Sequence, residues 1–398
     1  HVRMRATPPA SVQTQASSYR PLGTTTLKDG SVVQVGCVGE TAIDSLWSRR
    51  IRELLRPWGH PWTSQIEALL ATPGLGRFYV LHDPTSIDSA ESAPPFAAIT
   101  LCEHRDGGTL GNVWTSPARR RNGAMRALLR ATLADFRARG GRALILGTSH
   151  GSATYRVYED EGFCPVETGS GYMVLHTCGH IGGHISHAGG GGSNGYSDSH
   201  AVAARRVFES ARFHRVESAP LMGGGGGGGG GAARGAAVGA AAAVPSARVE
   251  PLAWRHYAAA PWLFVQGAIP GVVRNAPLSL MGRISTELPL IELIELQAER
   301  ARRTPPLPPS AVALVRSSDG ALVGFGSWGW EKVIPNAAQL DVFCHPRWWD
   351  YAPAMVAALQ LPRSAQRFVV TADSSCPMKI ALFERAGEII FYMFRMYV

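Results

Sequence analysis

The stretch Pro117-Ala118-Arg119-Arg120-Arg121-Asn122-Gly123-Ala124-Met125 decides how the fold of this sequence is interpreted. It follows a predicted strand at 109–115 and precedes a helix whose apolar residues recur at helical spacing. Unpaired backbone N–H groups and the positive end of the helix dipole meet at such a junction. Gly123 lets the main chain come close to a bound group because it has no Cβ. The stretch therefore predicts an anion site, and the arginines add attraction for a polyphosphate.

Strand and helix patterns alternate on both sides of this turn. The helix after it has an apolar stripe formed by Met125, Leu128, Leu129, Leu133 and Phe136, with Thr132 as its polar member. The other predicted elements are a strand pair with a turn at 24–35, a helix at 41–55, strands at 77–82, 96–104 and 143–147, a helix at 153–161 and a strand at 172–176. This order is typical of an α/β layer.

A second segment, Thr154-Tyr155-Arg156-Val157-Tyr158-Glu159-Asp160-Glu161-Gly162-Phe163, follows the strand at 143–147. Together with the strand order, the two segments resemble the GNAT superfamily of acetyl-CoA-dependent N-acetyltransferases over about residues 25–176. The resemblance implies an α/β domain with a mixed central sheet and helices on both faces. It also implies that an acetyl group passes from acetyl-CoA to a primary amine, of a small molecule or a peptide, by direct attack in a ternary complex.

The resemblance assigns cofactor contacts to the turn and to the strand before it. In the family this turn carries Arg/Gln-x-x-Gly-x-Gly/Ala, and its backbone amides bind the pyrophosphate of coenzyme A. Arg120 and Gly123 match, whereas Met125 stands where a second small residue is usual. The implied cofactor-binding residues are Val113, Trp114 and Thr115, which pair with pantetheine, and the turn residues Arg120, Arg121, Asn122, Gly123, Ala124 and Met125.

Two residues are candidates for catalysis. Tyr158 matches the family Tyr that often protonates the departing thiolate, and a packed helix aromatic is the alternative interpretation. Glu103, near the end of the strand at 96–104, is the candidate base that accepts the amine proton through water. The alternative interpretation is that Glu103 is a solvated charge at the end of the strand. His104 and His150 are lesser candidates for that base.

The order of elements recurs after a low-complexity stretch that contains nine consecutive glycines, Gly223–Gly231. Predicted strands at 311–317, 321–328 and 339–344 precede a helix at 351–361, a strand at 368–372, a helix at 378–386 and a strand at 389–398. The second turn, Arg347-Trp348-Trp349-Asp350-Tyr351-Ala352-Pro353, has no glycine and two indoles. We therefore expect this half to resemble the same fold but to be catalytically silent.

These patterns predict two GNAT-like domains joined by a Gly/Ala-rich disordered linker. We expect a disordered N-terminal segment at 1–23, the acetyl-CoA-binding catalytic domain at 24–177, the Gly/Ala/His-rich linker at 178–246 and the degenerate domain at 247–398. The alternative function is a non-catalytic CoA-sensing or protein-interaction scaffold that retains the fold. Transfer of a longer acyl group is a further alternative.

Composition excludes several other classes of protein. The net charge of +9 comes almost entirely from Arg, and no basic run is interleaved with aromatic residues, so we expect no nucleic-acid partner. No window of 18 apolar residues predicts a membrane span. The six cysteines form no CxxC pair, which favours an intracellular, cytoplasmic protein without a disulfide framework. The acid-free, Arg-containing N-terminus leaves an organellar location as the alternative.

Two residue clusters have competing interpretations. Metal-like spacing occurs at Cys178, His180, His184 and His187, but they border glycine-rich sequence with no hydrophobic frame, so we expect no metal. An aromatic cluster favours core or inter-domain packing over the floor of a ligand pocket, and it comprises Trp328, Trp330, Trp348 and Trp349.

Overall fold

The computed structural model describes residues 18–60, 62–84, 94–166, 171–177, 246–265, 287–330, 334–370, 376–385 and 390–391. Internal contacts divide the chain into two units. Unit 1 comprises the described parts of 1–102 and 110–139, and unit 2 comprises those of 103–109 and 140–398. Within the described residues, no helix is long and apolar enough to cross a bilayer.

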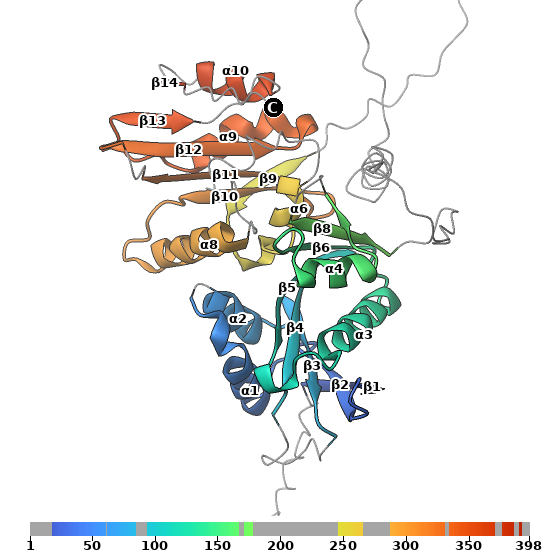
Figure 1. The fold of residues 1–398 in the computed structure, drawn as a ribbon. Coiled ribbons are helices and arrows are strands. Elements are labelled where there is room, and N and C mark those ends of the chain that lie inside the picture. Colours follow the sequence, from blue (N-terminus) through green and yellow to red (C-terminus); the bar gives the residue numbers. More distant parts are fainter. Residues whose placement is uncertain are drawn as a thin grey trace, which may run out of the picture. The chain divides into compact units, whose positions relative to one another are not determined.

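The first sheet has the strand order β1-β2-β3-β4-β5-β6-β8-β7 (Figure 1). Its first three strand pairs are antiparallel, whereas β5 pairs with β6 in parallel, so the sheet is mixed. The strands are β1 (Tyr19–Thr26), β2 (Val32–Val38), β3 (Gly76–His82), β4 (Ala97–His104), β5 (Gly107–Thr115), β6 (Ala143–Gly147), β7 (Cys164–Pro165) and β8 (Tyr172–His176).

Helices cover both sides of the strands in unit 1 (Figure 1). The contacting helices α1 (Ser45–Leu55) and α2 (Trp62–Ala71) lie on one side, and α3 (Ala124–Ala138) lies on the other. The apolar stripe of α3 is buried as its spacing predicts, apart from half-buried Met125. The α/β interpretation of this region is confirmed.

An ionic network fixes α3 against β1 and β3. The carboxylate of Asp135 on α3 accepts hydrogen bonds from the Tyr79 hydroxyl at 2.6 Å and from Arg20 at 2.7 Å. Arg139 donates to the same carboxylate at 3.0 Å. Burial raises the pKa of Asp135, but the bonds from Tyr79, Arg20 and Arg139 outweigh it and the pKa is lowered. The axis of α3, and with it the turn at its N-terminus, is thereby held in place.

Unit 2 contains a second mixed sheet, with the strand order β14-β13-β12-β11-β10-β9. The pairs from β9 to β12 are antiparallel, and β12 pairs in parallel with β13 over Ala337–Gln339. The strands are β9 (Ala247–Pro251), β10 (Ala311–Arg316), β11 (Leu322–Trp330), β12 (Ala337–Cys344), β13 (Arg367–Val370) and β14 (Ile390–Phe391).

The remaining helices belong to unit 2. They are α4 (Ala153–Asp160), α6 (Ala260–Val265), α8 (Glu287–Arg302), α9 (Ala352–Ala358) and α10 (Pro377–Arg385). Side chains of α9 and α10 pack with those of β10 to β12 in one apolar core, which includes Met355, Leu359 and Phe383. On α6, Trp262 is 2% exposed and packs against Ala143 and Ile145 of β6.

Most predicted elements are present, with shifted ends. The first strand begins at Tyr19, so residues 19–23 form part of β1 and do not belong to a disordered segment, because they pair with β2. The sequence analysis missed α2, β7, β9, α6 and α8. Residues 1–17, most of the linker predicted at 178–246, and the four candidate metal ligands of the linker lie outside the described residues. The boundaries of the two predicted domains stay predictions.

Candidate functional site

An irregular residue interrupts β5 shortly before the turn. Asn112 has φ +45° and is 4% exposed. Its side-chain Nδ2 donates to Oε1 of Gln65 on α2 at 2.8 Å. Few non-glycine residues adopt positive φ, and such a residue bends a strand. The bond to Gln65 thus stabilises a bend that sets the direction of the last residues of β5.

The pairing of β5 with β6 is short. Its register covers Gly107–Thr109 only, and the described residues contain no further β5–β6 pair. The following residues Val113, Trp114 and Thr115 are half-buried. Backbone groups of a strand that has lost its neighbour are free to pair with an extended ligand. This is the segment for which the sequence analysis expects pantetheine contacts.

The turn after β5 presents a run of unpaired amides. The N–H groups of Arg119 and Arg120 are occupied, because Arg119 donates to the Ser116 carbonyl at 2.9 Å and Arg120 donates to that of Pro117 at 3.3 Å. For the backbone N–H groups of 121–125, the described residues provide no acceptor. Ala127, farther along the helix, donates to the Gly123 carbonyl at 3.0 Å. The N-terminus of α3 is therefore open to an anion.

Backbone conformation shapes this turn. Arg121 has φ +68° and Gly123, the N-cap of α3, has φ +81°. Left-handed residues beside right-handed ones turn successive N–H groups toward one concave side, which is the geometry of an anion-binding nest. Only Gly123 adopts its conformation without steric cost. The glycine in the motif is thus explained by the backbone it must adopt.

The hairpin between β1 and β2 is hydrogen-bonded to the turn. The backbone N–H of Lys28 donates to the Asn122 carbonyl at 3.0 Å, and Asn122 Nδ2 donates to Asp29 Oδ2 at 2.8 Å. Hydrogen bonds from Ser31 lower the pKa of Asp29, which keeps this acceptor ionised. The carbonyl and side chain of Asn122 therefore bind the turn to the hairpin, while the backbone N–H of Asn122 stays available to a ligand.

The three arginines of the turn have different environments. Arg119 forms an ion pair with Asp83 and lies 4.7 Å from the centre of the Phe96 ring. Arg120 lies 4.8 Å from the centre of the Trp114 ring, and its Nε donates to the Thr115 carbonyl at 3.0 Å.

Arg121 differs from both because it is exposed and its side chain has neither an ion-pair partner nor a ring contact among the described residues. A second cation lies close to the turn, since a Cβ built on Gly123 would be 3.4 Å from Cγ of Lys28. Arg121 and Lys28 are therefore two cations, among the described residues, that are available to a phosphate here.

The candidate proton donor Tyr158 belongs to unit 2. It lies on α4, which begins at the N-cap Ser152, and it is 4% exposed. Its ring meets that of Phe163 edge-on, with centroids 5.7 Å apart. Burial raises the pKa of the Tyr158 hydroxyl, so the group stays protonated at neutral pH.

The candidate bases also lie in unit 2. Glu103 is half-buried near the end of β4, beside His104. Burial, with Arg105 and His256 nearby, lowers the pKa of His104 to about 4, so this imidazole is neutral at pH 7 and only weakly basic. His150 contacts Tyr155 edge-on at 5.0 Å. The assignment of a base stays a prediction.

The turn in the second half has a different structure. Pro346–Tyr351 forms a 3-10 helix in which Trp348 and Trp349 are buried. The N–H of Trp348 donates to the His345 carbonyl at 2.8 Å, and that of Ala352 donates to the carbonyl of Trp349. Pro346 and Pro353 have no N–H to offer. This turn offers fewer amides than the first, and its indoles occupy the adjoining core.

Sequence reasoning missed three residues of the candidate site. Asn112, Gln65 and Lys28 reach it through contacts between segments far apart in the chain. Only the isolated Lys28, one of three lysines in a sequence whose cations are otherwise Arg, carries a visible signal.

Comparisons with known proteins bear on the same region. Residues 43–163 match the family model described as Acetyltransferase (GNAT) family. Ribosomal-protein-S18-alanine N-acetyltransferase from Escherichia coli is 18% identical, with a TM-score of 0.29, over 39% of this chain and 98% of that chain. A GNAT family acetyltransferase from Brucella melitensis, solved with acetyl-CoA, is 19% identical, with a TM-score of 0.28, over 38% of this chain and 91% of that chain. No curated protein matches the sequence.

Proposed function

We propose that this chain transfers an acetyl group from acetyl-CoA to a primary amine, because residues 43–163 match the model of the GNAT acetyltransferase family. The observation that carries the proposal is the run of backbone amides at 121–125, for which the described residues provide no acceptor. Oxygens of a pyrophosphate are the acceptors that such a helix N-terminus favours. The residues present therefore fit the diphosphate of coenzyme A.

Each predicted cofactor residue has a role in this proposal. The amides of Arg121, Asn122, Gly123, Ala124 and Met125 bind the diphosphate, and the Arg121 side chain adds a charge. Arg120 acts on the turn itself, since it is stacked on Trp114 and bonded to the Thr115 carbonyl. Main-chain groups of Val113, Trp114 and Thr115 pair with the pantetheine arm.

The chemistry needs no covalent intermediate on the protein. Acetyl-CoA supplies an activated acyl group whose carbonyl the amine attacks directly. The domain holds the two reactants together, and backbone N–H groups of the bent β5 strand stabilise the developing oxyanion. Glu103 accepts a proton from the incoming ammonium through water, and Tyr158 donates one to the departing sulfur.

The remaining parts of the chain have supporting roles in the proposal. The second half is a diverged copy of the same fold that does not bind CoA, joined to the first by a low-complexity linker. The acceptor is an amine of a small molecule or a peptide, and no metal takes part. The compartment is intracellular, as the cysteine pattern predicts.

A pair of glycine variants tests the proposal. Gly123→Val places a β-branched side chain at φ +81° in the turn, and Gly140→Val places one at φ +84° just past the other end of α3. Both cost about 1–2 kcal/mol of strain, so the backbone strain is matched. Only Gly123→Val should abolish acetyl-CoA-dependent thiol release with a panel of amines. Equal activity of the two variants would contradict the assignment, as would absence of thiol release from the unmodified chain with every amine.

A further inference from the structure

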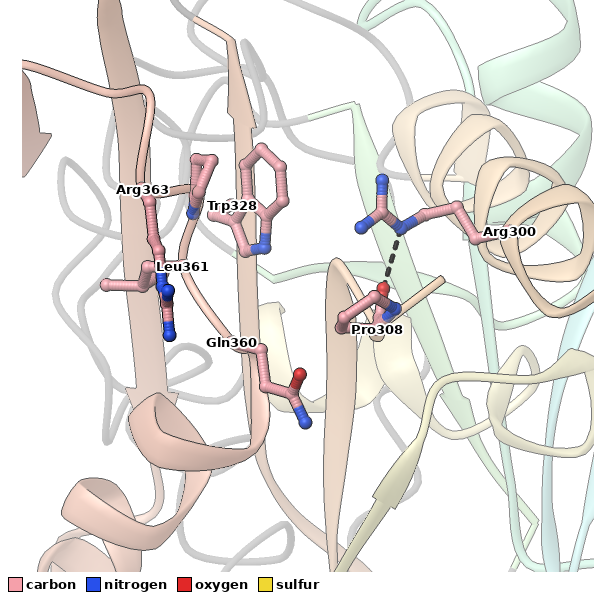
Figure 2. A pocket seen from close by; sticks show the side chains of 7 residues that line it. Arg300, Pro308, Trp328, Gln360, Leu361 and Arg363 are labelled. Atoms are coloured by element: carbon pink, nitrogen blue, oxygen red, sulfur yellow. Dashed lines mark hydrogen bonds between the residues drawn. The ribbon is translucent and has the colours of Figure 1, made fainter. Parts of the chain in front are cut away.

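A cavity in the second half is lined by residues that do not belong to the turn described above. It has a volume of about 490 Å³ and opens between α8, the segment after it, β11 and the connection from α9 to β13 (Figure 2). Its lining residues are Arg300, Pro308, Trp328, Gln360, Leu361, Pro362 and Arg363. Small-molecule sites commonly have volumes of about 300–1,000 Å³ and mix apolar walls with a few polar groups. The cavity has both properties.

The charge of Arg300 is only partly neutralised by its surroundings. Its Nε donates to the Pro308 carbonyl at 2.7 Å, and its guanidinium lies 5.3 Å from the centre of the Trp328 ring. The described residues give it no carboxylate partner, because the nearest acid along α8, Glu299, forms an ion pair with Arg303 at 2.6 Å. The side chain is half-buried, and burial lowers its pKa. A partly desolvated cation of this kind gains from an anionic ligand.

The floor of the cavity is rigid and aromatic. Trp328 is 7% exposed, and its Nε1–H donates to the Leu359 carbonyl at 3.0 Å. That bond satisfies the one polar group of the indole, which fixes the ring as a platform. Leu361, Pro362 and Pro308 extend the apolar wall.

A second cation belongs to the same cavity. Arg363 is exposed and has no ion-pair partner among the described residues. Figure 2 shows Arg300 and Arg363 on either side of the Trp328 side chain. No Asp or Glu is among the lining residues, so the charge of the cavity is positive. Two guanidinium groups beside an indole match a ligand that joins an anionic head to a flat apolar ring.

We propose that this cavity binds an aromatic anion, with its ring against the wall at Trp328 and Leu361 and its carboxylate or phosphate held by Arg300 and Arg363. Such a site gives the second half a ligand-binding role of its own. Of the aromatic cluster of the sequence analysis, Trp328, Trp348 and Trp349 all belong to the core, and Trp328 also lines the cavity. The proposal is independent of acetyl transfer in the first half.

Calorimetric titration of the full chain with three naphthalene probes tests the proposal. Naphthoate and naphthyl phosphate carry the two anionic heads, and naphthylmethanol is their neutral counterpart. The same titrations of Gly123→Val, whose first-half turn should no longer bind an anion, show whether that turn contributes to probe binding. At least one anionic probe should bind about tenfold or more tightly than the alcohol, and the stronger of the two identifies the head group. Equal binding of all three probes, or of none, overturns the proposal.

Variants locate the binding. Arg363→Gln and Arg300→Gln should each weaken the preferred probe about fivefold or more. Arg367→Gln serves as the matched control, since Arg367 is exposed on β13 outside the cavity, and it should leave binding unchanged. Arg300→Lys, which retains the charge, should bind more tightly than Arg300→Gln.

Thermal melts and CoA titrations of each variant show whether folding and the first half are intact. Because exposed Arg363 makes no contact that folding requires, an unaltered affinity in Arg363→Gln, together with one in Arg300→Gln, would overturn the assignment. Failure of acetyl transfer in the first half leaves these results interpretable, since they depend on the cavity alone.

Discussion

The two turns that follow β5 and β12 begin alike and then diverge. Thr115-Ser116-Pro117 ends the first strand and Cys344-His345-Pro346 ends the second, so the prolines align. Six residues later the first half has Gly123 at φ +81°, and the second has Ala352 inside a continuous helical path. In the first turn five amides lack acceptors among the described residues, whereas in the second the intervening residues form a 3-10 helix with buried indoles. A few residues between strand and helix thus decide whether the amides at the start of the helix lack acceptors or form a 3-10 helix.

The difference extends to the strands before the turns and the helices after them. Three residues before the strand end, Asn112 bends β5, whereas Asp341 of β12 forms a buried ion pair with Lys379 on α10. Four residues before the glycine that follows the next helix, the first half has Tyr158 and the second has Phe383. The second half therefore lacks the amide run and the hydroxyl at the corresponding positions. We interpret this as support for a catalytically silent second half.

The largest effect should come from replacing Tyr158 on α4 with phenylalanine, the residue that the second half has at the corresponding position of α10. Tyr158→Phe removes the proposed proton donor and leaves the packing against Phe163 in place. Turnover should fall about 100-fold or more, as expected for loss of a general acid, while the dissociation constant of CoA stays within about twofold. Steady-state kinetics and CoA titration measure the two quantities. Full turnover would remove Tyr158 from the mechanism and leave it a packed aromatic.

Local patterns were sufficient for the turn but not for everything around it. The helix stripe and the Arg-x-x-Gly spacing predict the position of the turn, because both are properties of neighbouring residues. The bend at Asn112 depends on Gln65, 47 positions away, so no local pattern signals it. The place of Lys28 beside Gly123 depends in the same way on the packing of the hairpin.

The helix α8 was missed for a different reason, which is its irregular residue pattern. Its sequence contains Pro289 near the start and charged residues throughout, which obscure a clean apolar stripe. Pro is tolerated in the first turn of a helix, so the helix forms despite it. The sequence analysis could not predict the cavity for the same reason, since Arg300 comes from this helix.

A second test disrupts the ion pair that distinguishes β12 from β5. Lys379 is 0% exposed and Asp341 is 1% exposed, and burial raises the pKa of Asp341. Lys379→Met leaves an uncompensated buried carboxylate and should lower the free energy of unfolding by about 3–5 kcal/mol. Urea denaturation measures the loss.

The double variant Asp341→Val/Lys379→Met should recover most of that stability, because an apolar pair replaces two buried charges. CoA affinity should stay unchanged in the single and the double variant if the first half alone binds CoA. A parallel loss of CoA affinity would contradict the separation of the two halves.

Smaller changes are expected from the two cations of the first turn. Lys28→Gln and Arg121→Gln each remove one exposed charge next to the amides and should weaken CoA about two- to fivefold. The losses should shrink as salt is raised. Arg347→Gln, in the second turn, is the matched control and should have no effect. Equal weakening by all three variants would indicate general attraction by the basic chain instead of a local site.

The smallest effect concerns the end of β4, which has His104, compared with the end of β11, which has the exposed Trp330. The folded pKa of His104, about 4, lies below that of a free imidazole, so the unfolded chain binds the extra proton first. Stability should therefore decrease as the pH falls from about 6.5 to about 4. Thermal melts over this range should show a shallower decrease for His104→Gln. An unchanged slope would mean that His104 is not buried as neutral imidazole.

The stoichiometry of CoA binding tests the central claim most directly. Isothermal titration of the full chain should give one CoA per chain, and Gly123→Val should reduce affinity about 100-fold, equivalent to two charge-assisted hydrogen bonds. Gly140→Val should retain the affinity of the unmodified chain. Two CoA molecules per chain, or one that Gly123→Val leaves unaffected, would contradict the proposal that the first turn alone binds the cofactor.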